Sequence, residues 1–521
     1  MGKIYKIHPG IGVARVAPST NGYFLAGETP GADPFEIDSN GNETPFTSYK
    51  DANSFLRRQG ARFRVFEYDQ PTVDGSLTLV REITAADAKI TWSVHLVAAK
   101  AAGPKMNDQA HGPDGRPTVL PLATPRNTPP AGFGVSDLKA DVRLSVTGAN
   151  ATPVIGTGRI VGADVMIGEA RTDANGRLVV LAGRGVARSW ANPPPPLDGN
   201  GSRDDEFLNN PTWHDDIADG TVDAKIAFMG GTPIDAVGAW VITTPPDFAP
   251  DTDALTTMLD IVENAIGVPL PAVLTYPQDI EPMLKRAAGL FFVNEQPVWA
   301  TMADHMANPA NLNSPSPAAK AARRQARDDL LSAQSDMRFY GLTKRQTDIL
   351  ARWVDGSFQT TADATRPAPN AADTLDRSVL ARCVGGGFFP GIEAGTTLRQ
   401  PTIYAEFARL TRGTFTDVDN AVRQLEPGLI SQRMACPWHA DFVECLGAWW
   451  PAQRPDIAGR TGADAGPRWD RGVLKGGDIG RPETSHQNMV DHFAQLGVLV
   501  KDQASGGLVE VGRDPNLDNI A

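Results

Sequence analysis

The spacing of apolar residues changes once along the chain, near residue 248, and this change limits the folds that the chain can adopt. Before it, short apolar or alternating runs such as ARFRVFEY, KITWSVHLVAA and RLVVLAG are separated by turn-rich segments such as PGADP and GPDGRP. Alternation with a period of two is typical of strands that bury one face of an antiparallel sheet. We therefore expect a β-rich first half, built from antiparallel sheets or a sandwich.

After this point the apolar residues follow helical spacing. The segment DTDALTTMLDIVENAIG places Leu255, Met258 and Leu259 on one side of a helix, and LTKRQTDILARWVDG begins at a Thr cap and stops at Gly. The predicted fold class is therefore α+β. We expect a β-rich domain at residues 1–248 and a mainly helical, loop-rich domain at residues 249–521, which carries the candidate site.

Length, charge and the N-terminal residues exclude several classes of protein. A chain of 521 residues exceeds the size at which one hydrophobic core stops growing, which agrees with two domains. A net charge of −12 without a Lys/Arg run argues against nucleic acid or an anionic membrane as the partner. No apolar segment is long enough to span a bilayer, and MGKIYKIHPGIGVARV lacks the apolar core of a secretory signal. We expect a cytoplasmic location.

The three cysteines, Cys383, Cys436 and Cys445, are too few for a disulfide framework in so long a chain. Reduced cysteines are often small buried hydrophobic residues, so a function has to be argued from their neighbours.

The most unusual neighbours lie in the segment RMACPWHADFVECLGAWWPAQRPD. If this segment is locally helical, Asp441 and Cys445 are four residues apart and share a face. A carboxylate raises the pKa of an adjacent thiol, so this pair does not suit a simple thiolate nucleophile. It suits an acid that takes protons during chemistry at a neighbouring ring. Trp469 follows in GPRWDRG, a loop bounded by glycine and proline of the kind that presents a side chain to a cavity.

Three other interpretations of this segment stay open on spacing alone. Tryptophans are usually core anchors, and Asp441 with Cys445 could be a helix acid next to a buried thiol. A zinc site formed by Cys436, His439, Asp441 and Cys445 has four possible ligands, although the spacing matches no closed Cys/His pattern. Motifs of dinucleotide folds, hydrolases, P-loops and zinc proteases are absent. Spacing therefore indicates an unusual site without naming its reaction.

Several segments, in order along the chain, resemble the lysine ε-oxidase/glycine oxidase (LodA-like) family. KIYKIHPGIGVARV is similar to its N-terminal signature, and LRRQGARFRVFEYD and ITWSVHLVAAKAA to its early strand motifs. RCVGGGFFPGIEAG and CPWHADFVEC resemble its Phe-Phe-Pro-Gly-Ile-Glu and Pro-Trp-x-Ala-Asp elements, and WWPAQRPD and HQNMVDHFAQLGVL follow in the expected order. Because these motifs extend from the first residues to near the last, the chain is identified as a member.

The resemblance implies a cofactor, cysteine tryptophylquinone, that the protein makes from its own side chains. In the matching motif, Cys445 supplies the thioether sulfur, and Asp441 is the acid that assembles the cofactor and serves as a base in turnover. Trp469 matches the family's tryptophan, with Trp450 as the alternative.

By the same resemblance, Cys383 and Glu393 lie near the active site, and His486 is a further candidate. The implied reaction is the oxidative deamination of a primary amine, an amino acid that is lysine-like or glycine-like, with consumption of O2 and release of ammonia and hydrogen peroxide. A flavoprotein maturation partner and a homo-oligomer are also implied.

The chain departs from better-known members in the short segment that separates Cys445 from Trp469. This departure leaves a second hypothesis open: a catalytically silent or unmodified member that acts as a scaffold or binding protein.

Overall fold

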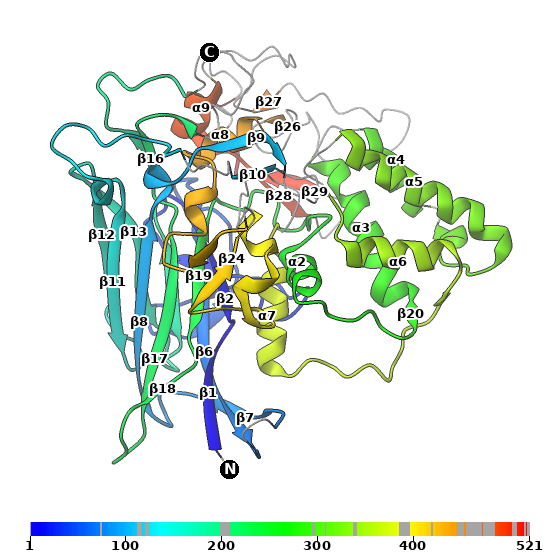
Figure 1. Ribbon diagram of the computed structural model, residues 1–521, viewed down its shortest axis with the longest axis horizontal. Coiled ribbons are helices and arrows are strands. Elements are labelled where there is room, and N and C mark those ends of the chain that lie inside the picture. Colours follow the sequence, from blue (N-terminus) through cyan, green and yellow to red (C-terminus); the bar gives the residue numbers. More distant parts are fainter. Residues whose placement is uncertain are drawn as a thin grey trace.

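A large sheet forms one side of the molecule, and a group of helices lies on the other (Figure 1). The computed structural model describes residues 2–72, 75–111, 117–119, 124–197, 209–293, 297–307, 309–336, 341–384, 396–417, 420–444, 453–454, 471–472, 485–502, 508–514 and 517.

Nine strands form the main path of the large sheet. In spatial order they are β11 (Ala140–Thr147), β8 (Lys89–Ala98), β17 (Asp219–Ala227), β19 (Ala239–Thr244), β2 (Ile11–Arg15), β6 (Arg58–Gln70), β14 (Leu178–Ala182), β13 (Ala163–Thr172) and β12 (Val154–Ile160). Further strands join this path at its sides: β1 (Gly2–His8), β3 (Tyr23–Leu25), β4 (Phe35–Ile37), β5 (Glu43–Pro45), β7 (Thr78–Ile83) and β18 (Ile234–Asp235).

Alternating burial marks the strands that turn one face toward a core, whereas the central strands β2, β14 and β19 are buried at every residue. In β11, every second residue is buried and the residues between are exposed, as the period of two predicts. The two end strands of the path lie against each other: a Cβ on Gly158 of β12 would approach the Cβ of Ala140 in β11 to 2.7 Å. The sheet therefore curls until its ends meet, and the core lies inside it.

Most pairings are antiparallel, as predicted, but β19 pairs with β2 and β3 with β6 in parallel. β2 and β19 come from opposite ends of the β-rich half of the sequence, so no hairpin fixes their relative direction. The sequence pattern could not show this pairing.

Large aromatic residues fill the core of the sheet. Phe63, Trp92 and Trp240 are almost completely buried. Both indole N–H groups have partners: Trp92 Nε1 donates to Gly176 O (2.9 Å) and Trp240 Nε1 to Asp219 Oδ2 (3.0 Å). Truncation of such a side chain to alanine costs about 3–5 kcal/mol.

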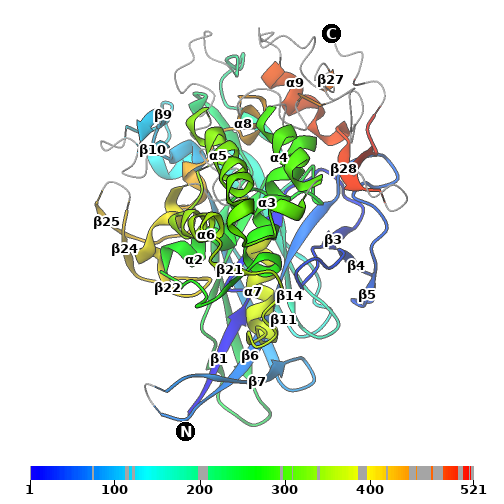
Figure 2. The same cartoon turned by 90° about the vertical axis from the view of Figure 1, so that its right-hand side faces the viewer.

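The helices follow the sheet in sequence, and α3 to α6 form one group in front of it in Figure 2. Their bounds are α2 (Met258–Ala265), α3 (Glu281–Gly289), α4 (Pro297–Ala307), α5 (Lys320–Asp336), α6 (Lys344–Val354), α7 (Ala371–Ala381), α8 (Trp438–Glu444) and α9 (Ser485–His492).

The ends of α6 agree with the sequence signals. The Thr343 side chain accepts from Gln346 N, and the Gln346 side chain accepts in return from Thr343 N (2.8 Å), which forms a capping box. Gly356, two residues beyond the helix, has a φ of +81°, a conformation that glycine adopts without strain. The predicted Thr start and Gly stop of this helix are confirmed.

Short two-stranded sheets lie mainly in the second half of the chain. They are β9 (Met106–His111) with β10 (Pro117–Val119), β15 (Ala187–Ser189) with β16 (Trp213–Asp215), β20 (Leu274–Thr275) with β21 (Phe358–Gln359), β22 (Tyr404–Glu406) with β23 (Arg409–Leu410), β24 (Thr414–Thr416) with β25 (Val422–Gln424), β26 (Gln453–Arg454) with β27 (Arg471–Gly472), and β28 (Val498–Lys501) with β29 (Leu508–Val511).

The predicted α+β class, β-rich first and helical and loop-rich afterwards, is confirmed. The last strand of the large sheet ends at Thr244 and α2 begins at Met258, so the predicted boundary at residues 248/249 falls between them. The division into two domains stays a prediction, because side chains from the first half hold segments of the second. Within the described residues, no helix has both the length and the apolar character needed to cross a membrane.

Candidate active site

The short helix α8 carries Asp441 and ends at Glu444, the residue before Cys445. The helical geometry expected around Asp441 is therefore present up to that point. The side chain of Asp441 lies outside what the structure describes, as do Cys445, Trp469, Trp450 and Glu393. The residues that surround α8 define the described part of the candidate site.

Four buried polar side chains from the first half of the chain hold the segment that leads into α8. We call Lys100, Arg126, Asn210 and Asp215 the α8 clamp; each is at most 3% exposed. Three of them donate to main-chain carbonyls of that segment: Arg126 to Gln432 O (3.4 Å) and Met434 O (3.0 Å), Lys100 Nζ to Ala435 O (2.9 Å), and Asn210 Nδ2 to Cys436 O (3.0 Å).

The centre of the clamp is a buried ion pair. Lys100 Nζ lies 2.7 Å from Asp215 Oδ2, and the same oxygen accepts from the main-chain N–H of Trp438, the first residue of α8, at 2.9 Å. A buried pair contributes less to stability than its Coulomb energy suggests, because both ions lose water. It does fix geometry, since any shift of the helix start would break a charge-assisted hydrogen bond.

Burial controls the protonation of the groups beside the clamp. The Cys436 thiol donates to Trp213 O (3.3 Å), and burial, aided by the charge of Asp215, raises its pKa to about 12. Burial, aided by the positive charge of Lys100, lowers the pKa of His439 well below its usual value. Cys436 is therefore a neutral thiol and His439 a neutral imidazole near pH 7.

Asp216 is the most perturbed carboxyl group in this region. Burial and the neighbouring charge of Asp215 raise its pKa to about 7. Its Oδ2 accepts from three successive main-chain N–H groups, those of Arg184 (2.6 Å), Gly185 (2.8 Å) and Val186 (3.1 Å). These hydrogen bonds favour the ionised form but do not outweigh burial.

Aromatic rings pack α8 against Phe493, the residue that follows α9. Trp438 stacks on His439 with ring centroids 3.6 Å apart and meets Phe442 and Phe493 edge to face. His486 lies on α9 and is fully buried. The two helices are neighbours in the structure, so the regions of Asp441 and His486 are brought together (Figure 1).

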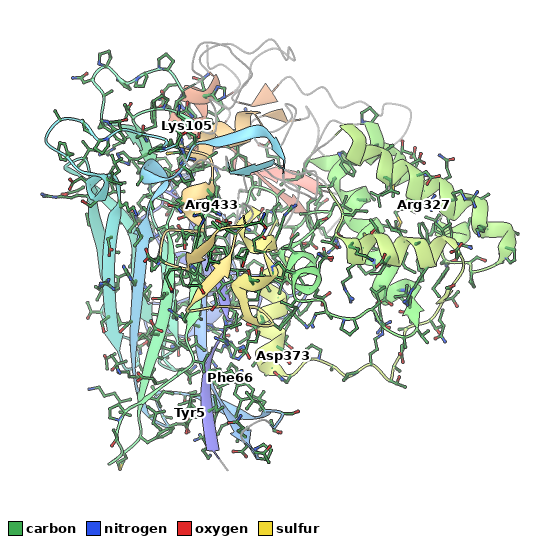
Figure 3. All side chains as sticks on the ribbon, in the orientation of Figure 1. Tyr5, Phe66, Lys105, Arg327, Asp373 and Arg433 are labelled. Carbon is green, nitrogen blue, oxygen red and sulfur yellow. The ribbon has the colours of Figure 1, made fainter. Side chains whose placement is uncertain are left out.

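Arg433 connects this region to the segment that follows Glu393. Its buried guanidinium donates to Asp417 Oδ1 (2.7 Å) and to Thr397 Oγ1 (3.3 Å), and it lies in the interior between the sheet and the helices (Figure 3).

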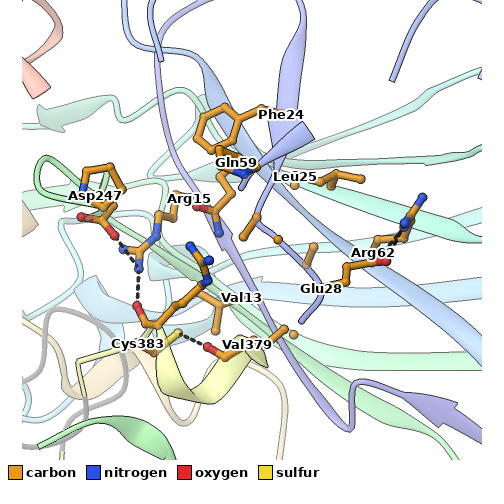
Figure 4. Close-up of a pocket in the computed structure, with 18 of the residues that line it drawn as sticks. Val13, Arg15, Phe24, Leu25, Glu28, Gln59, Arg62, Asp247, Val379 and Cys383 are labelled. Carbon is orange, nitrogen blue, oxygen red and sulfur yellow. Dashed lines mark hydrogen bonds and ion pairs between the residues drawn. The ribbon is translucent and has the colours of Figure 1, made fainter. Parts of the chain in front are cut away.

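Cys383 follows α7 and is buried; its Sγ donates to Val379 O (3.1 Å). It lines a pocket that Asp247 also lines (Figure 4). Phe248, which follows Asp247 in the sequence, packs edge to face on Phe442 of α8, with ring centroids 5.8 Å apart. The pocket and α8 are thus linked through two residues adjacent in sequence, Asp247 and Phe248, and the place of Cys383 near the active site stays a prediction.

The strands β26 and β27 join two candidate segments. Arg454 pairs with Arg471, and Gln453 with Gly472. In the sequence, β26 begins a short way after Cys445, and β27 begins two positions after Trp469. The pairing therefore joins the chain beyond the candidate cysteine to the chain beyond the candidate tryptophan.

No group of three or more His, Cys, Asp or Glu side chains suited to a metal ion occurs among the described residues. The zinc hypothesis needs Cys445 and the Asp441 carboxylate, which the structure does not describe. It stays untested, although a neutral Cys436 thiol is a poor ligand.

Two family models match the chain: L-lysine epsilon oxidase N-terminal over residues 8–243, and L-lysine epsilon oxidase C-terminal domain over residues 325–462. The chain belongs to the L-lysine ε-oxidase family. The second match includes α8 and Cys445. This membership confirms the resemblance seen in the sequence and places the chain among the amine-oxidising oxidoreductases, and it does not favour the scaffold hypothesis.

Individual relatives agree with the family. The L-lysine 6-oxidase of Marinomonas mediterranea is 26% identical, with 84% of this chain and 70% of the relative covered. The solved ε-lysine oxidase from the same organism superposes with a TM-score of 0.73 at 19% identity, over 98% of this chain and 95% of that one. A structure described as the Schiff base intermediate of that enzyme with L-Lys gives 0.72 at 20% identity, with the same coverage. These structures show a shared fold.

Proposed function

We propose that this chain catalyses the oxidative deamination of an amino acid, lysine-like or glycine-like, through a cysteine tryptophylquinone formed from Cys445 and Trp469. The reaction consumes O2 and releases ammonia and hydrogen peroxide. The observation that carries the proposal is the family match across residues 325–462, which contains Asp441 and Cys445 at their four-residue spacing. The name of the lysine 6-oxidase relative favours the lysine-like substrate.

The described residues fit such a cofactor. Helix α8 contains Asp441 and ends at Glu444, the residue before Cys445. The α8 clamp fixes where that helix begins. The β26–β27 pairing supports Trp469 over Trp450, because Trp469 lies only two positions before Arg471. The quinone would supply an electrophilic carbonyl for the substrate amine and would accept two electrons.

The protein's own groups would hold and move protons. Asp441 would take the proton of the Cys445 thiol during cofactor assembly and a carbon-bound proton of the substrate during turnover. A positioned base of this kind contributes about 10²- to 10⁴-fold in rate. Cys383, Glu393 and His486 would line the surroundings. The neutral Cys436 thiol would not compete as a nucleophile, because burial keeps it protonated.

Maturation would require a flavoprotein partner to introduce oxygen into the indole ring, and the enzyme would work as a homo-oligomer. Both proposals rest on the family, as does the choice of O2 as the electron acceptor. The cytoplasmic location stays a prediction.

The role of Asp441 can be tested with two variants of one helix. We expect Asp441→Ala, co-expressed with the flavoprotein, to give folded protein without quinone. Glu444→Ala, which removes another carboxylate three positions later on α8, serves as the matched control and should keep the quinone. Intact mass and the visible spectrum measure both. A normal quinone in Asp441→Ala would remove the role assigned to this carboxylate.

A further inference from the structure

The linker between β14 and β15, residues 183–186, is bound on one side by Asp216. The Oδ2 atom of Asp216 accepts from the main-chain N–H groups of three residues of this linker, at 2.6, 2.8 and 3.1 Å. Asp216 is only 1% exposed, and it follows Asp215, the carboxylate of the α8 clamp. The linker is therefore fixed at the same end of β16 that supplies the clamp.

On its other side, the linker meets the ring of Phe493, the residue that follows α9. Gly185 has a φ of +77°, in the left-handed region, and a Cβ on this residue would lie 2.6 Å from Phe493 Cζ. Carbon atoms that are not bonded to each other pack best at about 3.5–4.0 Å. Phe493 therefore occupies the space that a side chain at position 185 would need, and glycine suits both the contact and the backbone conformation.

The ring of Phe493 has little freedom to move away, because α8 packs against it. It meets Trp438 and His439 edge to face, with ring centroids 5.1 and 5.0 Å away, and all three side chains are buried. Close-packed interiors transmit strain and contain few gaps that could absorb a shift of about 1 Å. A displacement of Phe493 would therefore be passed on to α8.

Phe493 acts on the part of α8 that the clamp does not bind. The hydrogen bonds of the clamp end at the N–H of Trp438, the first residue of the helix. Asp441 comes three residues later, so its position lies on the same side of the helix as Trp438. A tilt of Trp438 would therefore also move Asp441. A misplacement of about 1 Å in an active site can lower a rate about 100-fold.

We propose that Gly185 and Phe493 are positioning residues for the quinone site, an inference that rests on the function proposed above. Because Gly185 has no side chain, the ring of Phe493 can lie on the linker and hold Trp438 and His439. This contact sets the direction of α8, whereas the clamp sets where the helix begins. Asp441 reaches its working position only when both contacts are made.

The first test compares two glycines with the same backbone conformation. Gly185→Ala places a methyl group against Phe493, whereas Gly162→Ala, at a φ of +79°, places it 3.7 Å from the ring of Phe133, an ordinary contact. Both variants carry the same left-handed strain, so the difference between them reports the contact with Phe493. With the flavoprotein co-expressed, Gly162→Ala should keep kcat per quinone. Gly185→Ala should lower it about 10- to 100-fold, with an equal fall in kcat/KM.

A double-variant cycle separates this contact from a general loss of stability. Leucine at position 493 lacks the ring atoms that meet position 185, so adding Gly185→Ala to Phe493→Leu should cost no more activity than Gly162→Ala does. A loss in the leucine background as large as in the wild-type background would overturn the inference. If Gly185→Ala does not fold, Phe493→Leu decides alone: it loosens the same contact without backbone strain, and an unchanged kcat per quinone would contradict the proposal.

A further readout does not need the cofactor. Hydrogen–deuterium exchange of the full-length chain, made without its flavoprotein, measures how firmly α8 is held. We expect the main-chain amides of α8 to exchange faster in Gly185→Ala than in the wild type or in Gly162→Ala, with β8 and β17 unchanged. Equal exchange of α8 in the two glycine variants would overturn the inference. If the wild-type protein consumes no amine while this difference in exchange persists, the proposed function fails and the positioning of α8 stands.

Discussion

The large sheet and the segment around α8 satisfy their main-chain polar groups in different ways. In the sheet, strands bond to strands: β8 and β17 pair over nine residues each. Before α8, four carbonyls from Gln432 to Cys436 accept from side chains that lie in the first half of the sequence. The sheet is therefore held by repeated hydrogen bonds between strands, whereas the candidate site is held by a few buried polar and charged side chains from the other half of the chain.

Because of this difference, we expect some substitutions to destabilise the sheet without disturbing the quinone site, and others to do the reverse. A seven-residue helix is too short to be stable by itself, so α8 depends on tertiary contacts. Loss of one clamp residue should disturb the quinone site more than the sheet, and loss of a sheet residue should do the reverse.

The largest expected effect comes from Lys100→Met. This change leaves the Asp215 carboxylate buried without its cation, which costs about 3–5 kcal/mol. We expect the free energy of unfolding to fall by this order and the quinone to be absent from the folded fraction. Chemical denaturation and intact mass measure the two effects. A normal quinone content would contradict the proposed dependence of the site on the clamp.

Asp216 should make stability depend on pH. Its pKa in the folded state, about 7, lies above the ordinary value, so the folded protein binds a proton more tightly than the unfolded chain. This contribution to stability is present at about pH 4 and is lost as the pH rises through 7, at up to about 1.4 kcal/mol per pH unit.

Asp216→Asn removes that contribution, so the stability of the variant relative to the wild type should rise from pH 4 to 7. His214, with a pKa lowered to about 4 by burial, titrates in both proteins and cancels in the difference. Denaturation midpoints at several pH values measure the effect. Parallel curves for the two proteins would show that Asp216 does not titrate in this range.

A smaller effect is expected from Ile90→Val in the sheet core. Ile90 is 1% exposed, and loss of one methylene from such a site costs about 0.5–1.5 kcal/mol. We expect lower stability with an unchanged quinone content per folded molecule. Loss of the quinone here would show that the sheet and the site are not separable.

The smallest effect is expected from Lys225→Met, the counterpart of Lys100→Met at an exposed ion pair. Lys225 and Asp235 lie 2.7 Å apart, but their side chains are 64% and 74% exposed. Surface pairs contribute less than about 1 kcal/mol. A loss as large as that of Lys100→Met would mean that the cost comes from the substitution itself and not from burial.

Local patterns predicted the parts of the fold that local interactions determine. The alternation in Ala140–Thr147 predicted a strand, and Thr343 predicted the start of a helix. The parallel pairing of β19 with β2 was not predictable, because nothing near either strand specifies a partner so distant in sequence. The motif around Asp441 was recognisable from the sequence through its family.

The α8 clamp was missed for a related reason. Lys100 begins a short 3₁₀ helix, Arg126 and Asn210 lie in loops, and Asp215 ends β16, and charged and polar residues are ordinary at all such places. They are distinguished only by their burial and by the segment that all four contact, the one that leads into α8. The one local signal was the pair of adjacent acids, Asp215 and Asp216, because adjacent carboxylates are unusual among residues with so little exposure.

The most direct test of the proposed cofactor is peptide mapping, with intact mass and visible spectrum, of the chain co-expressed with its flavoprotein. We expect a cross-linked peptide that joins Cys445 to Trp469, two added oxygens, and an absorption band that bleaches with an amino acid. A free Cys445 in an unmodified chain without such a band would contradict it, and would return the protein to the scaffold hypothesis.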